Sequence, residues 1–459
     1  MKSIGLVFLL SGVLLAGGQP LSAAKSCGDL DQSGSLGEPD ALALRRHLAR
    51  FEMLDLIAAG LCDVVDDAAS GGVSGDPARR CTMADVVVLQ RGAAGSGPAA
   101  APLCALGSQQ ACNVVHAGVG CSEASIALCV CATAVTCCTD AWTESCANLA
   151  IGAPCNAVKL IAIGDTGEGN PDQFAVADAM NQHCADVGGC TAVILAGDNF
   201  YDDGVQSTSD PQWVTKFEDP YNLPQLDIPF YAVFGNHDYG LLSLGVAQAQ
   251  IDYTSLPVGI GPGMRPSARW NMPASFYGVS SPGGIVDLFF FDTQGTAPMP
   301  SIATQIGIVP TQVAASTATW KVAVAHHPRF TAGAHQDDNV LLNLITTFPT
   351  PPFQAAYNPP GMYALQEAIY CGTDMFLSGH DHGRQLIDRG RDANCPDTFF
   401  AVSGAGSKVT ASTFPPEPGQ LYYDDTIEGF AYLSFTQTAM QFAFHEKDGS
   451  EVYSLLVLR

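Results

Sequence analysis

The stretch Ala192-Val-Ile-Leu-Ala-Gly-Asp-Asn-Phe-Tyr201 places an acidic residue and a tyrosine directly after a short apolar run. Such a run, followed at once by turn residues, is typical of a buried strand. Further runs of this form, each followed within two residues by Gly, Asp, Asn or His, are Leu160 to Ile163, Phe230 to Phe234, Val286 to Phe291, Val322 to Ala325, Met375 to Leu377 and Phe399 to Val402. In α/β sheets the carboxyl ends of strands open on a common crevice where ligands bind. We therefore expect an α/β domain with its site at these strand ends.

Five motifs follow these runs in chain order. They are Gly164-Asp165-Thr-Gly167, Gly197-Asp198-Asn-Phe-Tyr201, Gly235-Asn236-His237-Asp238, Val324-Ala-His326-His327 and Gly379-His380-Asp-His382. A single Gly-Asp or Gly-His-x-His carries little weight, because polar residues after strands commonly occupy turns. Together, however, the motifs supply carboxylate, amide and phenol oxygens with several imidazoles on rigid strand ends. This combination predicts a metal site.

The five motifs resemble those of the calcineurin-like metallophosphoesterase superfamily, and Asp198-Asn-Phe-Tyr201 narrows the resemblance to the small, tartrate-resistant purple acid phosphatases. The resemblance covers Val158 to Arg459. It includes Phe217-Glu-Asp219, Arg269-Trp-Asn271, Ser403-Gly-Ala-Gly406 and Glu428-Gly-Phe-Ala431. It implies an α/β fold for the catalytic domain, a four-layer α-β-β-α sandwich of two mixed sheets flanked by helices.

The resemblance also implies a binuclear metal centre. One group of ligands, for a ferric ion, would be Asp165, Tyr201 and His382, and the other, for a divalent ion, would be Asn236, His326 and His380. Asp198 would bridge the two ions. The donor chemistry agrees, because phenolate and carboxylate suit Fe(III), whereas imidazole with an amide oxygen suits Zn(II), Fe(II) or Mn(II). The sequence does not choose among the divalent ions.

Two metal ions ~3.5 to 4 Å apart generate hydroxide and clamp the phosphoryl oxygens. The resemblance implies that His237 and His335 contact the phosphate and protonate the leaving group, and that Asp238 orients His237. For His335 the alternative is a surface-loop histidine. For His327 we expect a packing role with the side chain directed away from His326, the alternative being an extra acid or ligand.

The predicted reaction is hydrolysis of small phosphate monoesters at acidic pH. A second hypothesis is a phosphodiesterase or nucleotide hydrolase that uses the same metals. A third is a binding protein, attached through its amino-terminal repeat, in which the phosphatase domain is vestigial. The complete set of predicted ligands argues against the third.

Three further features of this domain carry expectations. The segment from Thr293 to Thr319 is rich in Thr, Ala and Pro and lacks a clear amphipathic helix. Gly429 to Leu458 alternates apolar and polar residues around Lys447-Asp-Gly449, which predicts a terminal hairpin. Local disulfides are possible for Cys184 with Cys190 and for Cys371 with Cys395.

The chain begins with the features of a secretory signal peptide. Met1-Lys2 precedes an apolar run from Ile4 to Ala16, and small residues follow up to Ala24. A membrane anchor is the alternative, but the run is shorter than the ~20 residues that a bilayer requires. We expect a secreted or periplasmic protein without a membrane span. The formal charge of -25, from 20 Lys and Arg against 45 Asp and Glu, offers no basic patch for nucleic acid.

Residues 25–95 contain a dockerin-like repeat, with EF-hand-like spacing in its first loop. Side chains that carry an oxygen ligand occupy loop positions 1, 3, 5 and 12, and Ser35 lies between the last two of them. Gly34 occupies the position of the sharp turn. The candidate Ca(II) residues are Asp29, Asp31, Ser33, Ser35 and Asp40. An acidic turn before a helix is the alternative. A partial second copy of this pattern, from Thr82 to Gln90, predicts a second, weaker calcium loop. A repeat of this kind also predicts a possible dockerin-type docking partner.

A linker and a cysteine-rich segment occupy residues 96–156, between the repeat and the catalytic domain at 157–459. The chain has 16 cysteines, most of them before Asn156. Zinc ligation is one explanation, but a secreted context and the absence of paired Cys-x-x-Cys units favour disulfides.

Overall fold

The computed structural model describes residues 110–459 except 119, 139–140, 153–154, 241–246, 296–298 and 337–358. The expected signal peptide, the linker and the calcium-loop repeat, with Asp29, Asp31, Ser33, Ser35 and Asp40, lie outside these residues. Among the helices of the described part, none is long and apolar enough to cross a bilayer.

The first sheet has seven strands in the order β14-β13-β12-β1-β2-β3-β4. Strands β1 to β4 run parallel, and β12, β13 and β14 add to β1 in antiparallel fashion. Their bounds are β1 Val158–Ile163, β2 Ala192–Leu195, β3 Phe230–Ala232, β4 Trp270–Asn271, β12 Gly429–Phe435, β13 Ala439–Glu446 and β14 Glu451–Leu458. The expected hairpin is confirmed, with Gly449 at φ 89° in its turn.

The second sheet also has seven strands, in the order β11-β9-β10-β8-β7-β6-β5. Strands β6, β7, β8 and β10 are parallel, and β5, β9 and β11 pair antiparallel at the two sides. Their bounds are β5 Tyr277–Ser280, β6 Val286–Phe290, β7 Trp320–Val324, β8 Met375–Ser378, β9 Arg384–Ile387, β10 Phe399–Ser403 and β11 Gln420–Asp424. Both sheets are therefore mixed, as predicted.

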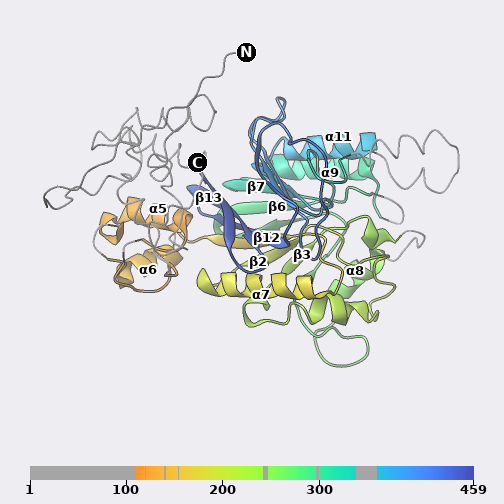
Figure 1. Ribbon diagram of the computed structural model, residues 1–459, viewed down its shortest axis with the longest axis horizontal. Coiled ribbons are helices and arrows are strands. Elements are labelled where there is room, and N and C mark those ends of the chain that lie inside the picture. The colour runs from red at the N-terminus through yellow and green to blue at the C-terminus, as the bar shows by residue number, and fades with distance from the viewer. Residues whose placement is uncertain are drawn as a thin grey trace, which may run out of the picture.

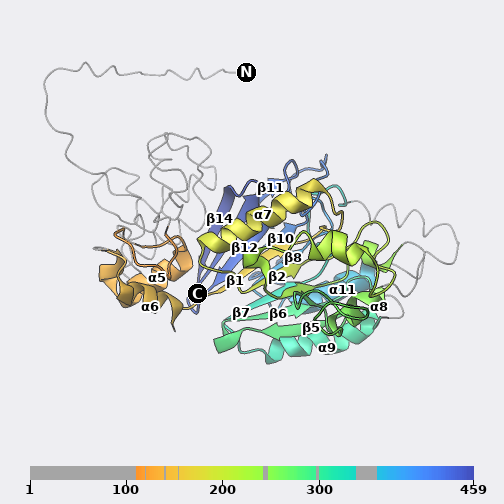
Figure 2. The same cartoon turned by 90° about the horizontal axis from the view of Figure 1, so that it is seen from below.

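Helices cover the outer faces of the stacked sheets. In Figure 2, α7 (Pro171–Asp186) lies beyond the first sheet and α9 (Ile302–Ala315) beyond the second, and Figure 1 shows α11 (Pro359–Tyr370) beside α9. One apolar cluster fills the space between the sheets, and separate clusters lie under α7 and under α9 with α11. The four-layer α-β-β-α sandwich is confirmed. Shorter helical segments are α8 Ala247–Thr254, the π-helix Trp213–Glu218, and the 3₁₀ turns Pro224–Leu226, His237–Tyr239 and Pro282–Gly284.

Helix α9 corrects the expectation for Thr293 to Thr319. Ser301 caps its start by accepting a hydrogen bond from the Thr304 N–H at 3.2 Å, and Val309 and Val313 are buried against the second sheet. Pro310 lies inside the helix and weakens its sequence signal, since proline disfavours helix interiors. Burial of the apolar face decides the conformation here, and local propensity does not.

Disulfides account for the cysteines whose pairing the structure gives. Bonds join Cys184 to Cys190 and Cys371 to Cys395, as expected. In the cysteine-rich segment the bonds are Cys112–Cys121, Cys129–Cys155 and Cys137–Cys146. The described residues contain no free cysteine. The preference for disulfides over zinc is confirmed for these cysteines.

The cysteine-rich segment packs directly against the first sheet. It contains α5 (Ala124–Thr133), a 3₁₀ turn (Val135–Cys138) and α6 (Glu144–Ile151), and its buried residues belong to the same apolar cluster as those of β1, β12 and β13. Both views place the segment at one end of the sandwich, next to β13 in Figure 1 and next to β14 in Figure 2. Segment and catalytic domain therefore share one core.

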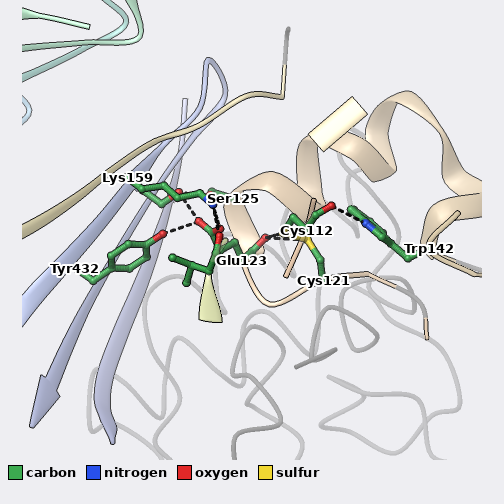
Figure 3. The surroundings of a disulfide bond; sticks show 9 residues. Cys112, Cys121, Glu123, Ser125, Trp142, Lys159 and Tyr432 are labelled. Carbon is green, nitrogen blue, oxygen red and sulfur yellow. Dashed lines mark hydrogen bonds and ion pairs between the residues drawn. A yellow bond between two sulfur atoms is a disulfide. The ribbon is translucent and has the colours of Figure 1, made fainter. Parts of the chain in front are cut away.

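A buried carboxylate fastens this contact (Figure 3). Glu123, 1% exposed, lies 2.6 Å from the Lys159 ammonium of β1. The same carboxylate accepts hydrogen bonds from the hydroxyls of Tyr432 at 2.6 Å and Ser434 at 3.0 Å, both on β12. A buried charge that keeps every partner is tolerated, whereas removal of one partner leaves the others unpaired.

We expect Glu123→Ala to destabilise the protein by about 3 kcal/mol, because it removes the shared acceptor of Lys159, which is 13% exposed, and of two hydroxyls. Urea denaturation followed by circular dichroism measures this loss. Asp172→Ala, which removes one partner of the exposed Lys447 pair, is the control and should cost less than about 1 kcal/mol. Equal, small losses in both variants would show that Glu123 does not fasten the segment.

Candidate metal centre

The predicted ligands lie where parallel strands end. Asp165 follows β1, Asp198 and Tyr201 follow β2, and Asn236 lies beyond β3, all in the first sheet. The second sheet supplies three histidines: His326 after β7, with His380 and His382 after β8. The two sets meet at these strand ends.

Three of the first-sheet residues form one half of the site around the Tyr201 hydroxyl. This oxygen lies 2.9 Å from Asp165 Oδ1, 3.0 Å from Asp198 Oδ2 and 3.2 Å from His382 Nε2. A phenol carries a single proton, so it can donate to only one carboxylate at a time. The remaining close oxygen contact requires another positive charge or proton in the same space.

The other half of the site centres on His326. Its Nε2 atom lies 3.1 Å from Asn236 Oδ1, 3.2 Å from His380 Nδ1 and 3.5 Å from Asp198 Oδ2. The Asp198 carboxylate thus contacts both halves. Asp165, Asp198 and His326 each present one ligand atom within 4.8 Å of the other two.

Hydrogen bonds outside the site orient the imidazoles. His326 Nδ1 lies 2.8 Å from the Ala196 carbonyl, so it carries the proton and leaves Nε2 for the site. His382 Nδ1 lies 2.9 Å from Thr410 Oγ1. The backbone amide of His380 donates to Asp165 Oδ2 at 2.8 Å, which ties a ligand of one sheet to a ligand of the other.

Three of the predicted ligands have strained backbones. Asp165, Asp198 and His380 have φ values of 58°, 52° and 70°, and in the described chain these are the non-glycine residues with positive φ. Such conformations cost about 1–3 kcal/mol each and persist where the surrounding structure holds them. Hydrogen bonds such as that from the Asp165 amide to the Gly197 carbonyl, at 2.9 Å, provide this support.

The electrostatics of the site favour a bound cation. Asp165, Asp198 and Tyr201 are at most 2% exposed. Burial raises the pKa of Asp165 to about 7 and, with both carboxylates adjacent, raises that of Tyr201 well above its ordinary value. For Asp198, burial acts in the same direction, but the neighbouring His326 outweighs it and lowers the pKa. These oxygens cannot all ionise together without a compensating charge. Carboxylates, phenol, amide and imidazoles therefore fit a pair of metal ions.

The predicted acid-base residues lie at the open side of this cluster. The His237 side chain is 37% exposed, with Nε2 4.0 Å from Asp198 Oδ2. The His335 ring centre lies 4.6 Å from that of His380 and 5.4 Å from that of His382, and its amide is bound by Asp381 at 2.7 Å. His335 is thus close to the ligands.

Asp238 lies elsewhere than expected. Its buried carboxylate accepts hydrogen bonds from the Asn199 amide at 3.0 Å and from Gln250 Nε2 at 2.8 Å. It therefore supports the backbone next to Asp198. The His237 ring is oriented by the Asp202 carbonyl, 2.6 Å from Nδ1, and not by Asp238.

The expectation that His327 points away from His326 is wrong. The two ring centres are 5.0 Å apart, and the His327 ring lies 4.5 Å from that of His380. The side chain is 3% exposed, and its Nδ1 lies 2.7 Å from Thr293 Oγ1. The loop beyond β7 turns within the site, so strand alternation no longer sets the direction of the side chain.

Asp292 is a site neighbour that the motifs missed. It follows the apolar run of β6 and is fully buried, and its carboxylate accepts hydrogen bonds from the Tyr239 hydroxyl and, at 2.9 Å, from the Gln294 amide. Tyr239 lies in the turn that follows Asn236 and His237. The signal available in the sequence was its strand-end position, which matches that of the metal-site residues.

The chain is similar to known phosphoesterases and phosphatases. Residues 158–384 match the family model of calcineurin-like phosphoesterases. Purple acid phosphatase 7 of Arabidopsis thaliana is 29% identical over 319 residues, which cover 64% of this chain and 84% of that protein. Human (Homo sapiens) tartrate-resistant acid phosphatase type 5 is 26% identical over 338 residues, covering 67% and 92%. The structure of purple acid phosphatase PPD1 from yellow lupin (Lupinus luteus) seeds aligns with a TM-score of 0.47 at 15% identity, covering 66% and 54%.

Fold and site thus define a metal-dependent phosphoesterase. Within that class, residues 158–384 are similar to calcineurin-like phosphoesterases, and among its relatives the chain is similar to purple acid phosphatases.

Gly235→Ala should disrupt the centre selectively. A Cβ built at Gly235 lies 2.1 Å from Asp198 Oδ1 and 2.3 Å from the Asp198 amide nitrogen, so the carboxylate between the two halves must move. We expect metal affinity to fall by at least about 100-fold, the upper range for loss of a residue behind a ligand. Elemental analysis after dialysis measures it. Gly278→Ala, whose Cβ would lie 3.8 Å from its nearest contact, should keep its metal.

Proposed function

We propose that this protein is a secreted acid phosphatase that hydrolyses phosphate monoesters at a binuclear metal centre. The observation that carries the proposal is the position of Asp198, whose carboxylate contacts both the Tyr201 hydroxyl and the His326 imidazole. A carboxylate between two complete donor sets is the arrangement that a bridged metal pair requires. Acid phosphatase is also the activity named for the relatives from plants and mammals.

Each half of the site supplies donors for one ion. Asp165, Tyr201 and His382 would hold Fe(III), and Asn236, His326 and His380 would hold Zn(II), Fe(II) or Mn(II). Asp198 would be shared. When bound, such a pair activates water and neutralises the oxygens of the phosphoryl group.

The protein's own residues then bind the ester and supply a proton. His237 and His335 lie on the open side of the two donor sets, where an incoming phosphate would meet them. The Asp202 carbonyl holds the His237 ring, and Asp381 holds the backbone of His335. Imidazoles in these positions donate hydrogen bonds to the phosphate and give a proton to the departing alkoxide. Because this step needs a protonated imidazole, the proposed activity belongs at acidic pH.

The disulfides support the proposed secretion, because such bonds persist in oxidising compartments. A binding protein with a vestigial site is less well supported, since the complete donor set is in mutual contact. A phosphodiesterase on the same metals remains the second candidate, and substrate comparison separates the two.

Asp198→Ala should abolish hydrolysis of p-nitrophenyl phosphate by the purified protein, because both donor sets lose their shared ligand. Asp186→Ala, on the exposed end of α7, is the matched control and should retain activity. Unchanged turnover by Asp198→Ala would end the proposal. A large preference of the unmodified protein for bis(p-nitrophenyl) phosphate would favour the phosphodiesterase.

His335→Gln tests the proton donor. We expect kcat to fall by about 100-fold or more with an alkyl phosphate, whose alkoxide needs a proton, and by less with p-nitrophenyl phosphate, whose phenolate leaves unaided. Steady-state kinetics on both substrates gives the two ratios. His116→Gln, in the cysteine-rich segment, controls for loss of an imidazole. Equal losses on both substrates would assign His335 to phosphate binding alone.

A further inference from the structure

A single loop contacts each of the three residues that are proposed to bind the ferric ion alone. This loop follows β10 and runs from residue 404 to residue 410. Ser407 donates to the Asp165 carbonyl at 2.6 Å. The Thr410 hydroxyl lies 2.9 Å from His382 Nδ1, and the Thr410 amide donates to the His382 carbonyl at 3.0 Å. Between these two anchors, Lys408 extends over the third ligand, Tyr201.

The Lys408 ammonium lies on the face of the Tyr201 ring. Its Nζ atom is 3.3 Å from the ring centroid and 2.7 Å from Glu168 Oε1. The His237 ring contacts Tyr201 edge-on, with centroids 4.5 Å apart. The other lysine in this region, Lys216, donates to the Tyr201 carbonyl and not to the ring. The phenol is thus the one ferric-site donor whose π face meets a side-chain cation.

The position of Lys408 is fixed by more than its ion pair. Lys408 and Glu168 are 29% and 30% exposed, and an ion pair in that setting is worth little by itself. The backbone is held on one side by Asn170, whose side-chain amide donates to the Ser407 carbonyl at 2.8 Å, and on the other by Thr410. A surface ion pair alone gives no reason for the ammonium to rest on an aromatic ring.

A cation over an aromatic face is attracted by the electrons of that face. When the phenol is ionised the ring carries negative charge, so the attraction increases and the electrons of the phenolate are held more tightly. A phenolate in that state gives less electron density to the metal ion that it binds. Lys408 is the lysine that lies on the face of this ring, whereas Lys216 contacts the Tyr201 backbone carbonyl.

We propose that Lys408 is a positioning residue that limits electron donation from Tyr201 to the ferric ion. The inference rests on the proposed function, because it requires Tyr201 to be a ferric ligand. It assigns to Lys408 no contact with the reacting phosphate.

The visible spectrum of the iron-loaded, full-length protein tests this inference. The tyrosinate-to-iron charge-transfer band should move to longer wavelength in Lys408→Met, because the unscreened phenolate gives its electrons more easily. Lys408→Arg keeps the charge and should leave the band near its original position. Glu168→Gln should move the band to shorter wavelength, because it removes the anion that offsets the ammonium.

Lys447→Met is the matched control, since Lys447 is also a partly exposed lysine in carboxylate ion pairs, with Asp172 and Glu428. Its band should not move. Iron content is measured for every variant, so that a shift is not confused with loss of metal. Unshifted bands in iron-replete Lys408→Met and Glu168→Gln would overturn the inference, and Glu168→Gln alone decides it if Lys408→Met fails to fold. A colourless, iron-replete unmodified protein would instead refute the ferric tyrosinate of the proposed function.

Discussion

The structure is organised around three oxygen ligands that crowd one buried space. The carboxylates of Asp165 and Asp198 both lie within hydrogen-bond distance of the Tyr201 phenolic oxygen, which has one proton to share. Burial makes ionisation of Asp165 and Tyr201 unfavourable, while His326 favours it for Asp198. Bound cations would compensate the negative charge of these buried oxygens, which is unfavourable without them. Such an arrangement fits a metal site, since buried unpaired charge otherwise destabilises a fold.

Neither sheet contains the site alone. The first sheet provides the carboxylates, the phenol and the amide, the second provides the ligand histidines, and the His380 amide bound to Asp165 joins them. The relative position of the sheets therefore fixes the geometry of the centre. That position is set by the apolar cluster between them, which also includes the cysteine-rich segment. Through Glu123 and Lys159 the segment supports β1, the strand that ends one residue before Gly164-Asp165.

Much of this could be predicted from sequence because the strand ends carry two signals at once. Apolar runs gave the central strands, and the polar residues after them gave the ligands. Helix α9 was not predicted, because burial of Val309 and Val313 outweighs the unfavourable effect of Pro310 on the helix. The side-chain direction expected for His327 and the partner expected for Asp238 were wrong, because both residues lie in turns, where strand alternation does not apply. The positive φ angles of three ligand residues had no signal, since none of them is glycine.

The residues behind the ligands are the least predictable part, and they explain why the two halves differ. Around the half proposed to hold Fe(III), the residues come from one loop: Ser407, Lys408 and Thr410 contact a carbonyl, a ring and an imidazole. Around the other half, the Ala196 carbonyl orients His326. This support comes from the backbone directly after β2. Backbone support is insensitive to substitution, whereas side-chain support is not. Sequence change in the loop can therefore alter the surroundings of Asp165, Tyr201 and His382, while the half of the site around His326 keeps its shape.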